Sequence, residues 1–246
     1  MPSGRFAPSP TGRLHLGNLR TALLAWLFAR STDSAFLLRI EDLDVAAARP
    51  EHYDSQPGDL AAIGLDWDGP ITLQSERRAM HDAAIDRLTA DGLTFPCYCT
   101  RKEVHEAAQA PHGGPPGAYP GTCRDLTAAD RAAREADGRR PALRLRAAEQ
   151  QVTIHDRFHG EHTGTVDDLV LRRADGTPAY NLAVVVDDAD QGVEEVVRAD
   201  DLLTSTPRQA HLADLLGLRR PTWAHVPLAV GPDGERLAKR HGAVSL

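Results

Sequence analysis

Residues 5–18 read Arg5-Phe6-Ala7-Pro8-Ser9-Pro10-Thr11-Gly12-Arg13-Leu14-His15-Leu16-Gly17-Asn18. A short extended segment at 5–8 enters a turn-forming run at 9–12. A helix is predicted over 16–30, because apolar side chains recur there at helical spacing. The mostly apolar run at 35–40 suits a strand covered on both faces. The order strand, glycine-containing turn, helix, strand is a βαβ unit, which predicts an α/β fold.

The turn that enters this helix suits a phosphate group. Amide groups at a helix N-terminus point at an anion, the helix dipole favours it, and His15 can donate to a phosphoryl oxygen. Glycines in the turn let a ligand approach the backbone. A structural loop explains a His-x-Gly-Asn turn equally well when the motif is read alone.

Two more helices are predicted in the first part of the chain, over 54–63 and 77–91. Gly64 and Gly92 follow them, and glycine at that position can adopt the left-handed conformation that ends a helix. The α/β pattern then stops, because the stretch 95–175 holds all three cysteines and several short apolar runs. This stretch is therefore interpreted as an insertion.

The α/β pattern resumes near residue 179. Continuous apolar runs predict buried strands at 182–186 and 193–197. Asp187 and Asp188 end the first run, and we expect them to cap the next turn.

A last helix is predicted over 207–216, with Thr206 as its N-cap and Gly217 at its end. The α/β domain is thus split in two. The chain is expected to divide into a first half of this domain, an inserted module and a second half, at residues 1–94, 95–177 and 178–246.

Composition limits the class of protein. With 246 residues, 41% of them hydrophobic, the chain can bury a sizeable core. The formal net charge of −7 argues against binding nucleic acid by bulk electrostatics alone, although a local basic patch remains compatible. No run approaches the roughly 18 apolar residues of a spanning helix. We expect a cytoplasmic protein without a membrane partner.

The cysteines indicate a metal. Cys97 and Cys99 are too close for an ordinary disulfide, and with Cys123 they make an odd set. Three thiolates fit a tetrahedral zinc site that lacks one ligand, for which His105 and His112 are candidates. A closed site of this kind would be structural. Three buried free thiols are the alternative.

The stretch 5–23 resembles the His-Ile-Gly-His region of class I aminoacyl-tRNA synthetases, in the glutamyl and glutaminyl branch. A partial match to the Lys-Met-Ser-Lys-Ser loop of that class lies at 236–240, where Lys239 keeps the second lysine. Ala199 stands where related sequences carry glycine. Further glutamyl-type segments lie at 39–44, 65–70, 74–77 and 179–203. The resemblance implies a Rossmann-like class I catalytic domain with an inserted, zinc-containing module similar to an acceptor-binding domain.

Glutamate needs a carboxylate for its ammonium group and cations for its side-chain carboxylate. The resemblance implies a glutamate-binding set of Arg5, Ala7, Ser9, Glu41, Tyr180 and Arg198. Without it, the non-functional interpretations are favoured: Arg5 and Arg198 as surface arginines, Tyr180 as a half-buried strand residue and Glu41 as an acid at a helix start.

The resemblance also implies the nucleotide and metal sites. Catalysis would depend on His15 and Lys239, which stabilise charge on the phosphates of ATP, with Mg²⁺ on the triphosphate. The implied ATP-binding set is His15, Gly17, Asn18 and Lys239. The implied zinc ligands are Cys97, Cys99, Tyr119 and Cys123, with His105 and His112 competing with the tyrosine.

The sequence ends at Leu246, soon after the loop at 236–240, and on this basis we expect no anticodon-binding module. This resembles the glutamyl-Q tRNA(Asp) synthetases. The resemblance implies activation of L-glutamate by ATP without tRNA, and transfer to queuosine at the wobble position of tRNA(Asp). Two alternatives stay open: a catalytic fragment of an ordinary glutamyl-tRNA synthetase that charges the tRNA 3′ end, and a non-catalytic module that binds glutamate or ATP.

Overall fold

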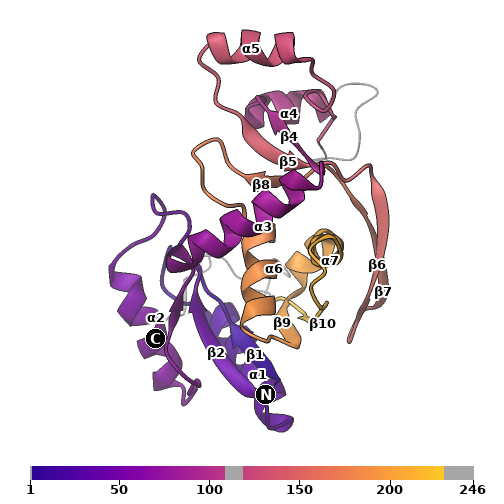
Figure 1. The fold of residues 1–246 in the computed structure, drawn as a ribbon. Helices are drawn as coiled ribbons and strands as arrows, with labels where there is room; N and C mark the ends of the chain where they lie inside the picture. Colours follow the sequence, from indigo (N-terminus) through magenta and orange to yellow (C-terminus); the bar gives the residue numbers. More distant parts are fainter. Residues whose placement is uncertain (1, 109–118, 230–246) are drawn as a thin grey trace.

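The computed structural model describes residues 2–108 and 119–229. Its first unit consists of β1 (Ser3–Phe6), α1 (Leu16–Ser31) and β2 (Ala35–Ile40), with β1 and β2 paired in parallel. This confirms the predicted βαβ unit (Figure 1). The short strand β3 (Thr72–Leu73) pairs with β2 and completes a parallel order β1-β2-β3.

The second half of the sheet comes from the end of the described chain. β9 (Glu195–Ala199) and β10 (Thr222–Val226) pair in parallel, and a parallel bridge between Ser3 and Val193 joins them to β1. A hairpin of β6 (Gln150–Asp156) and β7 (Gly160–Val166) extends this side, since Trp223 of β10 pairs with Asp156. Segments far apart in the sequence thus form neighbouring strands whose carboxyl ends share one edge.

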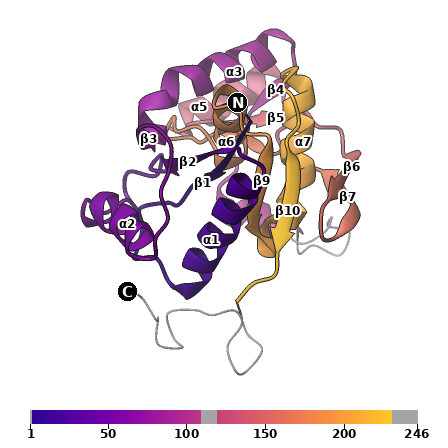
Figure 2. The ribbon, with the colours of Figure 1, turned by 90° about the horizontal axis from the view of Figure 1, so that it is seen from below.

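Helices cover both faces of these strands. α1 packs on β1 and β9 on one face, as Figure 2 shows. On the other side lie α3 (Arg78–Ala90), α6 (Tyr180–Asp190) and α7 (Thr206–Leu215), whose apolar side chains share a core with Ile154, Val196 and Trp223. The α/β part also contains α2 (Glu51–Ala62) and the 3-10 turns η1 (Gln74–Arg77) and η2 (Asp200–Ser205).

The inserted part has a small sheet of its own. β4 (Thr94–Cys97), β5 (Ala142–Leu145) and β8 (Val170–Arg172) are antiparallel. The helices α4 (Arg101–Ala108) and α5 (Ala128–Ala136) lie with this sheet at one end of the molecule (Figure 1). A separate core holds Phe95, Tyr98 and Tyr119 together with two of the cysteines.

One predicted strand is wrong. Residues 182–186 form the middle of α6, whose buried side chains include Leu182, Ala183 and Val186. A continuous apolar run has no period, so it cannot distinguish a buried strand from a helix that is covered on most sides. Asp187 and Asp188 are consequently not turn caps but buried residues in the last turn of that helix.

The N-cap of α7 was also predicted wrongly. Ser205 occupies the N-cap without a side-chain capping bond, and Thr206 is the first helical residue. The hydroxyl of Thr206 is turned toward Arg198 instead. Gly217, with a φ of 62°, ends the helix as expected.

Among the described helices, none has both the length and the apolar character that crossing a bilayer requires.

Candidate active site

A cavity of about 510 Å³ opens at the carboxyl ends of β1 and β9, beside the N-terminus of α1. Crevices at this edge of an open parallel sheet are common ligand sites. The six residues predicted to bind glutamate all line it: Arg5, Ala7, Ser9, Glu41, Tyr180 and Arg198. His15 and Asn18 line it as well, so one space adjoins both predicted sites.

The first turn of α1 is closed by a reciprocal cap. His15 Nδ1 accepts a hydrogen bond from the Asn18 amide at 3.3 Å, and Asn18 Oδ1 accepts one from the His15 amide at 3.2 Å. The imidazole is therefore fixed against the start of the helix. Gly17 is needed for this arrangement, because a Cβ there would lie 3.0 Å from Cε1 of the His15 ring.

The chain that follows β10 returns to this turn. Arg20 Nη1 donates to the Pro227 carbonyl at 2.5 Å, and a Cβ at Gly17 would lie 3.7 Å from Cβ of Ala229. Lys239 and the rest of the 236–240 loop lie outside the described residues. The approach of Lys239 to His15 thus stays a prediction.

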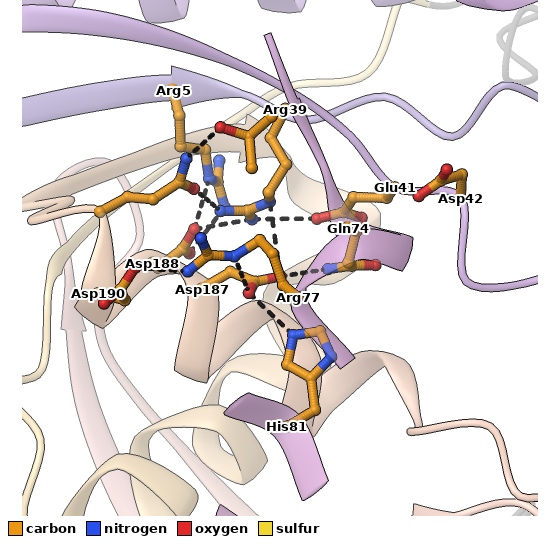
Figure 3. Close-up of polar contacts among 12 residues, drawn as sticks. Arg5, Arg39, Glu41, Asp42, Gln74, Arg77, His81, Asp187, Asp188 and Asp190 are labelled. Atoms are coloured by element: carbon orange, nitrogen blue, oxygen red, sulfur yellow. Dashed lines mark hydrogen bonds and ion pairs between the residues drawn. The ribbon is translucent and has the colours of Figure 1, made fainter. Parts of the chain in front are cut away.

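Two arginines below the cavity share one aspartate. Arg5 donates from Nε and Nη2 to the two carboxylate oxygens of Asp188, each at 3.2 Å. Arg39, fully buried, lies 2.8 Å from Asp188 Oδ1 and 3.1 Å from Glu41 Oε1. Figure 3 shows Asp188 between the two guanidinium groups.

The carboxyl pKa values in this group move in opposite directions. Burial alone would raise the pKa of Asp188, but Arg5 and Arg39 outweigh it and the pKa is lowered. At Glu41 burial dominates over Arg39 and Arg5, and the pKa is raised. Asp188 is thus held firmly as an anion.

Asp187 links the same helix to η1 and α3. Its carboxylate accepts from Arg77 Nε at 2.7 Å, from Gln74 Nε2 at 2.7 Å and lies 2.8 Å from His81 Nε2. Burial opposes ionisation, but His81 and the arginines outweigh it and lower the pKa of Asp187. Asp187 and Asp188 therefore connect the two halves of the α/β domain through charge (Figure 3).

Arg198 is bound differently. Its Nε donates to His225 Nε2 at 3.0 Å and its Nη2 to Thr206 Oγ1 at 2.9 Å. Its Nη1 is buried and has no hydrogen-bond partner among the described residues. Burial, with Arg5 nearby, outweighs the opposing effects of Tyr180 and Asp188 and lowers the pKa of Arg198. In the described part of the chain this guanidinium forms no ion pair with a carboxylate.

A second cavity of about 960 Å³ adjoins the first. Ser9, Glu41 and Tyr180 line both spaces. The second cavity reaches the inserted part, where Cys99 and the cationic side chains Arg101, Arg144 and Arg173 line it. Asp44 and Asp175 line it too, and both pair with Arg173. The predicted glutamate site therefore opens toward a wall in which Arg101 and Arg144 pair with no carboxylate of the described residues.

The three cysteines lie together. Their sulfur atoms are all within 4.8 Å of one another, and the Cys99 and Cys123 sulfurs are 3.5 Å apart. The Tyr119 hydroxyl lies 3.3 Å from Cys97 Sγ and accepts from the Cys123 amide at 2.8 Å. Sulfurs bound to one tetrahedral zinc are about 3.8 Å apart, so these residues fit that metal. His105 lines the large cavity, and His112 lies outside the described residues.

Comparison with known proteins identifies the family. The family described as "tRNA synthetases class I (E and Q), catalytic domain" matches residues 3–246. A glutamyl-Q tRNA(Asp) synthetase from Nocardia farcinica is 66% identical over 244 residues, covering 99% of this chain and 78% of the relative. The chain belongs to the glutamyl-Q tRNA(Asp) synthetase family. It is accordingly a ligase of the class I aminoacyl-tRNA synthetase type.

Other comparisons agree with membership of the glutamyl-Q tRNA(Asp) synthetase family. A relative of the same name from Symbiobacterium thermophilum is 51% identical over 259 residues, covering 99% of this chain and 79% of the relative. Among solved structures, a glutamate-tRNA synthetase from Elizabethkingia anophelis has a TM-score of 0.86 and 29% identity. That match covers 98% of this chain and 53% of the solved one, and it shows the class I catalytic fold.

Several buried residues at or next to this candidate site were not predicted from the sequence. They are Arg39, Asp156, Asp188, Thr206 and His225, all buried polar or charged side chains. For Asp188 a signal was present, since acids beside an apolar run must be paired if that run is buried. For Asp156 and His225 no local pattern marks the contact.

Proposed function

We propose that this chain activates L-glutamate with ATP in the absence of tRNA, and then transfers the glutamyl group to queuosine at the wobble position of tRNA(Asp). The observation that carries the proposal is Arg198, a buried guanidinium without a carboxylate partner in the described structure, in the wall of a cavity. A buried charge is stable only when it is compensated, so the site favours an anionic ligand. The names of the similar relatives support the same substrate.

Glutamate would be held at both ends. Its side-chain carboxylate would accept from Arg198 Nη1, with the Tyr180 hydroxyl and Arg5 beside it. Its ammonium group would meet Ser9 and the carboxylate of Glu41, and the Ala7 backbone would complete the site. This orientation directs the α-carboxylate toward the N-terminus of α1.

Activation would then depend on position and electrostatics. An oxygen of the glutamate α-carboxylate attacks the α-phosphorus of ATP, and the bond to pyrophosphate breaks. The amide groups at the start of α1, His15 and Lys239 would stabilise the charge on the phosphates, with Mg²⁺ on the triphosphate. The products are glutamyl-adenylate and pyrophosphate.

Transfer would use the larger cavity. A hydroxyl group of the acceptor nucleoside attacks the adenylate carbonyl, and AMP leaves. Arg101 and Arg144 line this cavity and suit the phosphates of a nucleic acid, whereas Arg173 is paired with Asp44 and Asp175. Their position supports an acceptor that approaches between the α/β domain and the inserted part.

The decisive experiment is the exchange of pyrophosphate into ATP without tRNA. Glutamate should support exchange, whereas aspartate and glutamine should not. Absence of exchange with glutamate would favour a non-catalytic binding module. Nuclease mapping of glutamylated tRNA(Asp), with and without queuosine, should place the label in the anticodon loop. Label at the 3′ end would instead assign ordinary glutamyl-tRNA synthetase activity.

A structural zinc held by Cys97, Cys99, Tyr119 and Cys123 is part of the proposal. Its support is the separation of the ligand atoms: the three sulfurs lie within 4.8 Å of one another, and the Tyr119 hydroxyl lies 3.3 Å from Cys97 Sγ. Cys123→Ser should abolish zinc in the purified protein, measured by elemental analysis, and should lower the thermal midpoint. Tyr119→Phe should weaken zinc retention against a chelator, while His105→Ala should leave it unchanged. The opposite result for the last two variants would make His105 the fourth ligand.

A further inference from the structure

A chain of hydrogen bonds reaches Arg198 from behind the cavity. Asp156 Oδ2 lies 2.6 Å from His225 Nδ1, and His225 Nε2 accepts from Arg198 Nε at 3.0 Å. The three residues come from three strands of one sheet, since His225 pairs in register with Arg198, and Trp223 of the same strand pairs with Asp156. The side chains of Asp156 and His225 are fully buried.

The hydrogen bonds determine which ring nitrogen carries the proton. Asp156 accepts the backbone amide of His225 at 3.0 Å with Oδ2, and the amides of Phe158 and His159 at 3.0 Å with Oδ1. These bonds, with that of the His225 ring, outweigh burial and lower the pKa of Asp156. An ionised carboxylate only accepts, so Nδ1 of His225 is the protonated nitrogen. An arginine Nε only donates, so Nε2 of His225 is the acceptor.

His225 is therefore neutral. Burial lowers its pKa to about 4, with Arg198 acting in the same direction and Asp156 opposing. Arg198 donates an oriented hydrogen bond to this ring but meets no negative charge there. Arg5, in the same cavity wall, is instead bonded at two atoms to the carboxylate of Asp188.

We propose that His225, held by Asp156, is a positioning residue that orients Arg198 while leaving its charge uncompensated, and that it thereby sets the preference for a side-chain carboxylate over an amide. A carboxylate in place of His225 would neutralise Arg198 and compete with the substrate for it. A purely apolar residue would leave the guanidinium with only its bond to Thr206 to orient it. This inference rests on the proposed binding of glutamate at Arg198.

The consequence is a specific kind of selectivity. Glutamine has nearly the shape of glutamate but no charge at its side-chain amide, so shape alone distinguishes the two poorly. An uncompensated guanidinium favours the carboxylate, because only the carboxylate forms charge-assisted bonds with it. His225 would thus act on glutamate binding and not on the phosphate chemistry.

A matched pair of variants tests this. In His225→Gln, the side-chain oxygen reaches the place of Nε2 and can still accept from Arg198. In His225→Asn, the shorter side chain reaches only the place of Nδ1 and the acceptor is lost. In the exchange assay, His225→Asn should raise KM for glutamate at least tenfold while kcat and KM for ATP stay within about twofold. His225→Gln should restore KM for glutamate to within about threefold of the original.

Two more variants complete the design. Asp156→Asn removes the anion that fixes the ring and should also raise KM for glutamate, with a smaller ratio of kcat/KM between glutamate and glutamine. His155→Asn, on the exposed face of the same strand, is the control and should change neither value. Far-ultraviolet circular dichroism and thermal midpoints would verify that each variant is folded.

The outcomes separate the two proposals. Equal effects of His225→Asn on glutamate KM, ATP KM and kcat, or failure of His225→Gln to restore glutamate binding, would reduce His225 to a structural residue and overturn the inference. An original protein that exchanges without dependence on glutamate would overturn the proposed function itself.

Discussion

Two clusters of buried polar side chains adjoin the same cavity, and they differ in how the charge of their arginines is compensated. Below the cavity, Arg5 and Arg39 share the carboxylate of Asp188, so each guanidinium has an anion in direct contact. Beside it, Arg198 donates to the neutral ring of His225. The carboxylate of Asp156 is bonded to the other side of that ring and does not touch Arg198. The first group is complete within the protein, whereas the second has no anion in contact with it among residues 2–108 and 119–229.

The difference teaches how one site can be both stable and selective. A compensated group fixes the backbone of β1, β2 and α6 around the cavity. An uncompensated cation costs stability, and that cost is relieved only when an anion binds. The substrate would therefore supply the missing partner, so that binding and charge compensation are one event.

The largest expected effect is on the compensated group. Asp188→Asn leaves Arg5 and Arg39 without their shared anion, and breaking a buried pair in this way costs about 3–5 kcal/mol in the free energy of unfolding. Urea denaturation would measure it. Asp190→Asn is the matched control on the same helix, because its carboxylate is 46% exposed where it meets Arg77. That control should change stability by no more than about 1 kcal/mol. Similar losses of unfolding free energy in both variants would mean that burial does not make the ion pairs of Asp188 more important for stability than the exposed pair of Asp190.

A smaller effect, and one of different kind, is expected at Arg198. Arg198→Met should lower kcat/KM for glutamate about 100-fold, which corresponds to about 2.7 kcal/mol. The free energy of unfolding should stay equal or rise, because an uncompensated buried cation is replaced by an apolar chain of similar length. Glutamate-dependent exchange and urea denaturation of the same preparation would give both values.

Arg5→Met provides the comparison. This variant should lose stability as well as activity, since it leaves Asp188 with only one arginine. A loss of stability at Arg198 as large as at Arg5 would show that the two groups do not differ in the way their contacts indicate.

The sequence predicted the part of the fold that local pattern controls. The helix predicted over 16–30 and the strand predicted over 35–40 match α1 and β2. Both signals, the helical spacing of apolar residues and a short continuous apolar run, come from residues that are close in the sequence. The resemblance selected six residues, from Arg5 to Arg198, that line one cavity. Their roles toward glutamate stay a prediction, as do the boundaries of the inserted module.

The remainder could not be predicted for two physical reasons. The run at 182–186 is apolar on every side, so it carries no period, and its identity as a helix also decides that Asp188 faces Arg5. The bonds from His225 to Arg198 and Asp156 join positions 27 and 69 residues apart. Parallel strands bring such residues together through long crossovers, and no local sequence signal marks which partners will meet.

The smallest expected effect is a loss of stability in mild acid. His225 faces Asp156 from β6, Arg198 from β9 and His159 from the turn after β6, and burial lowers its pKa from the ordinary 6.5 to about 4. As pH falls below 6.5 the unfolded chain takes up a proton on this ring, whereas the folded protein does not until about pH 4. Stability is therefore complete above this range and is lost on acidification, by roughly 2 kcal/mol between pH 7 and pH 5.

The variant His225→Gln isolates this contribution. Its side chain does not titrate, so the difference in free energy of unfolding between the original protein and the variant should shrink or reverse by roughly 2 kcal/mol over the same two pH units. His211, whose pKa burial also lowers, is present in both proteins and cancels in the difference. A difference that stays constant with pH would mean that His225 titrates as in the unfolded chain, and its neutral ring could then not explain the uncompensated charge of Arg198.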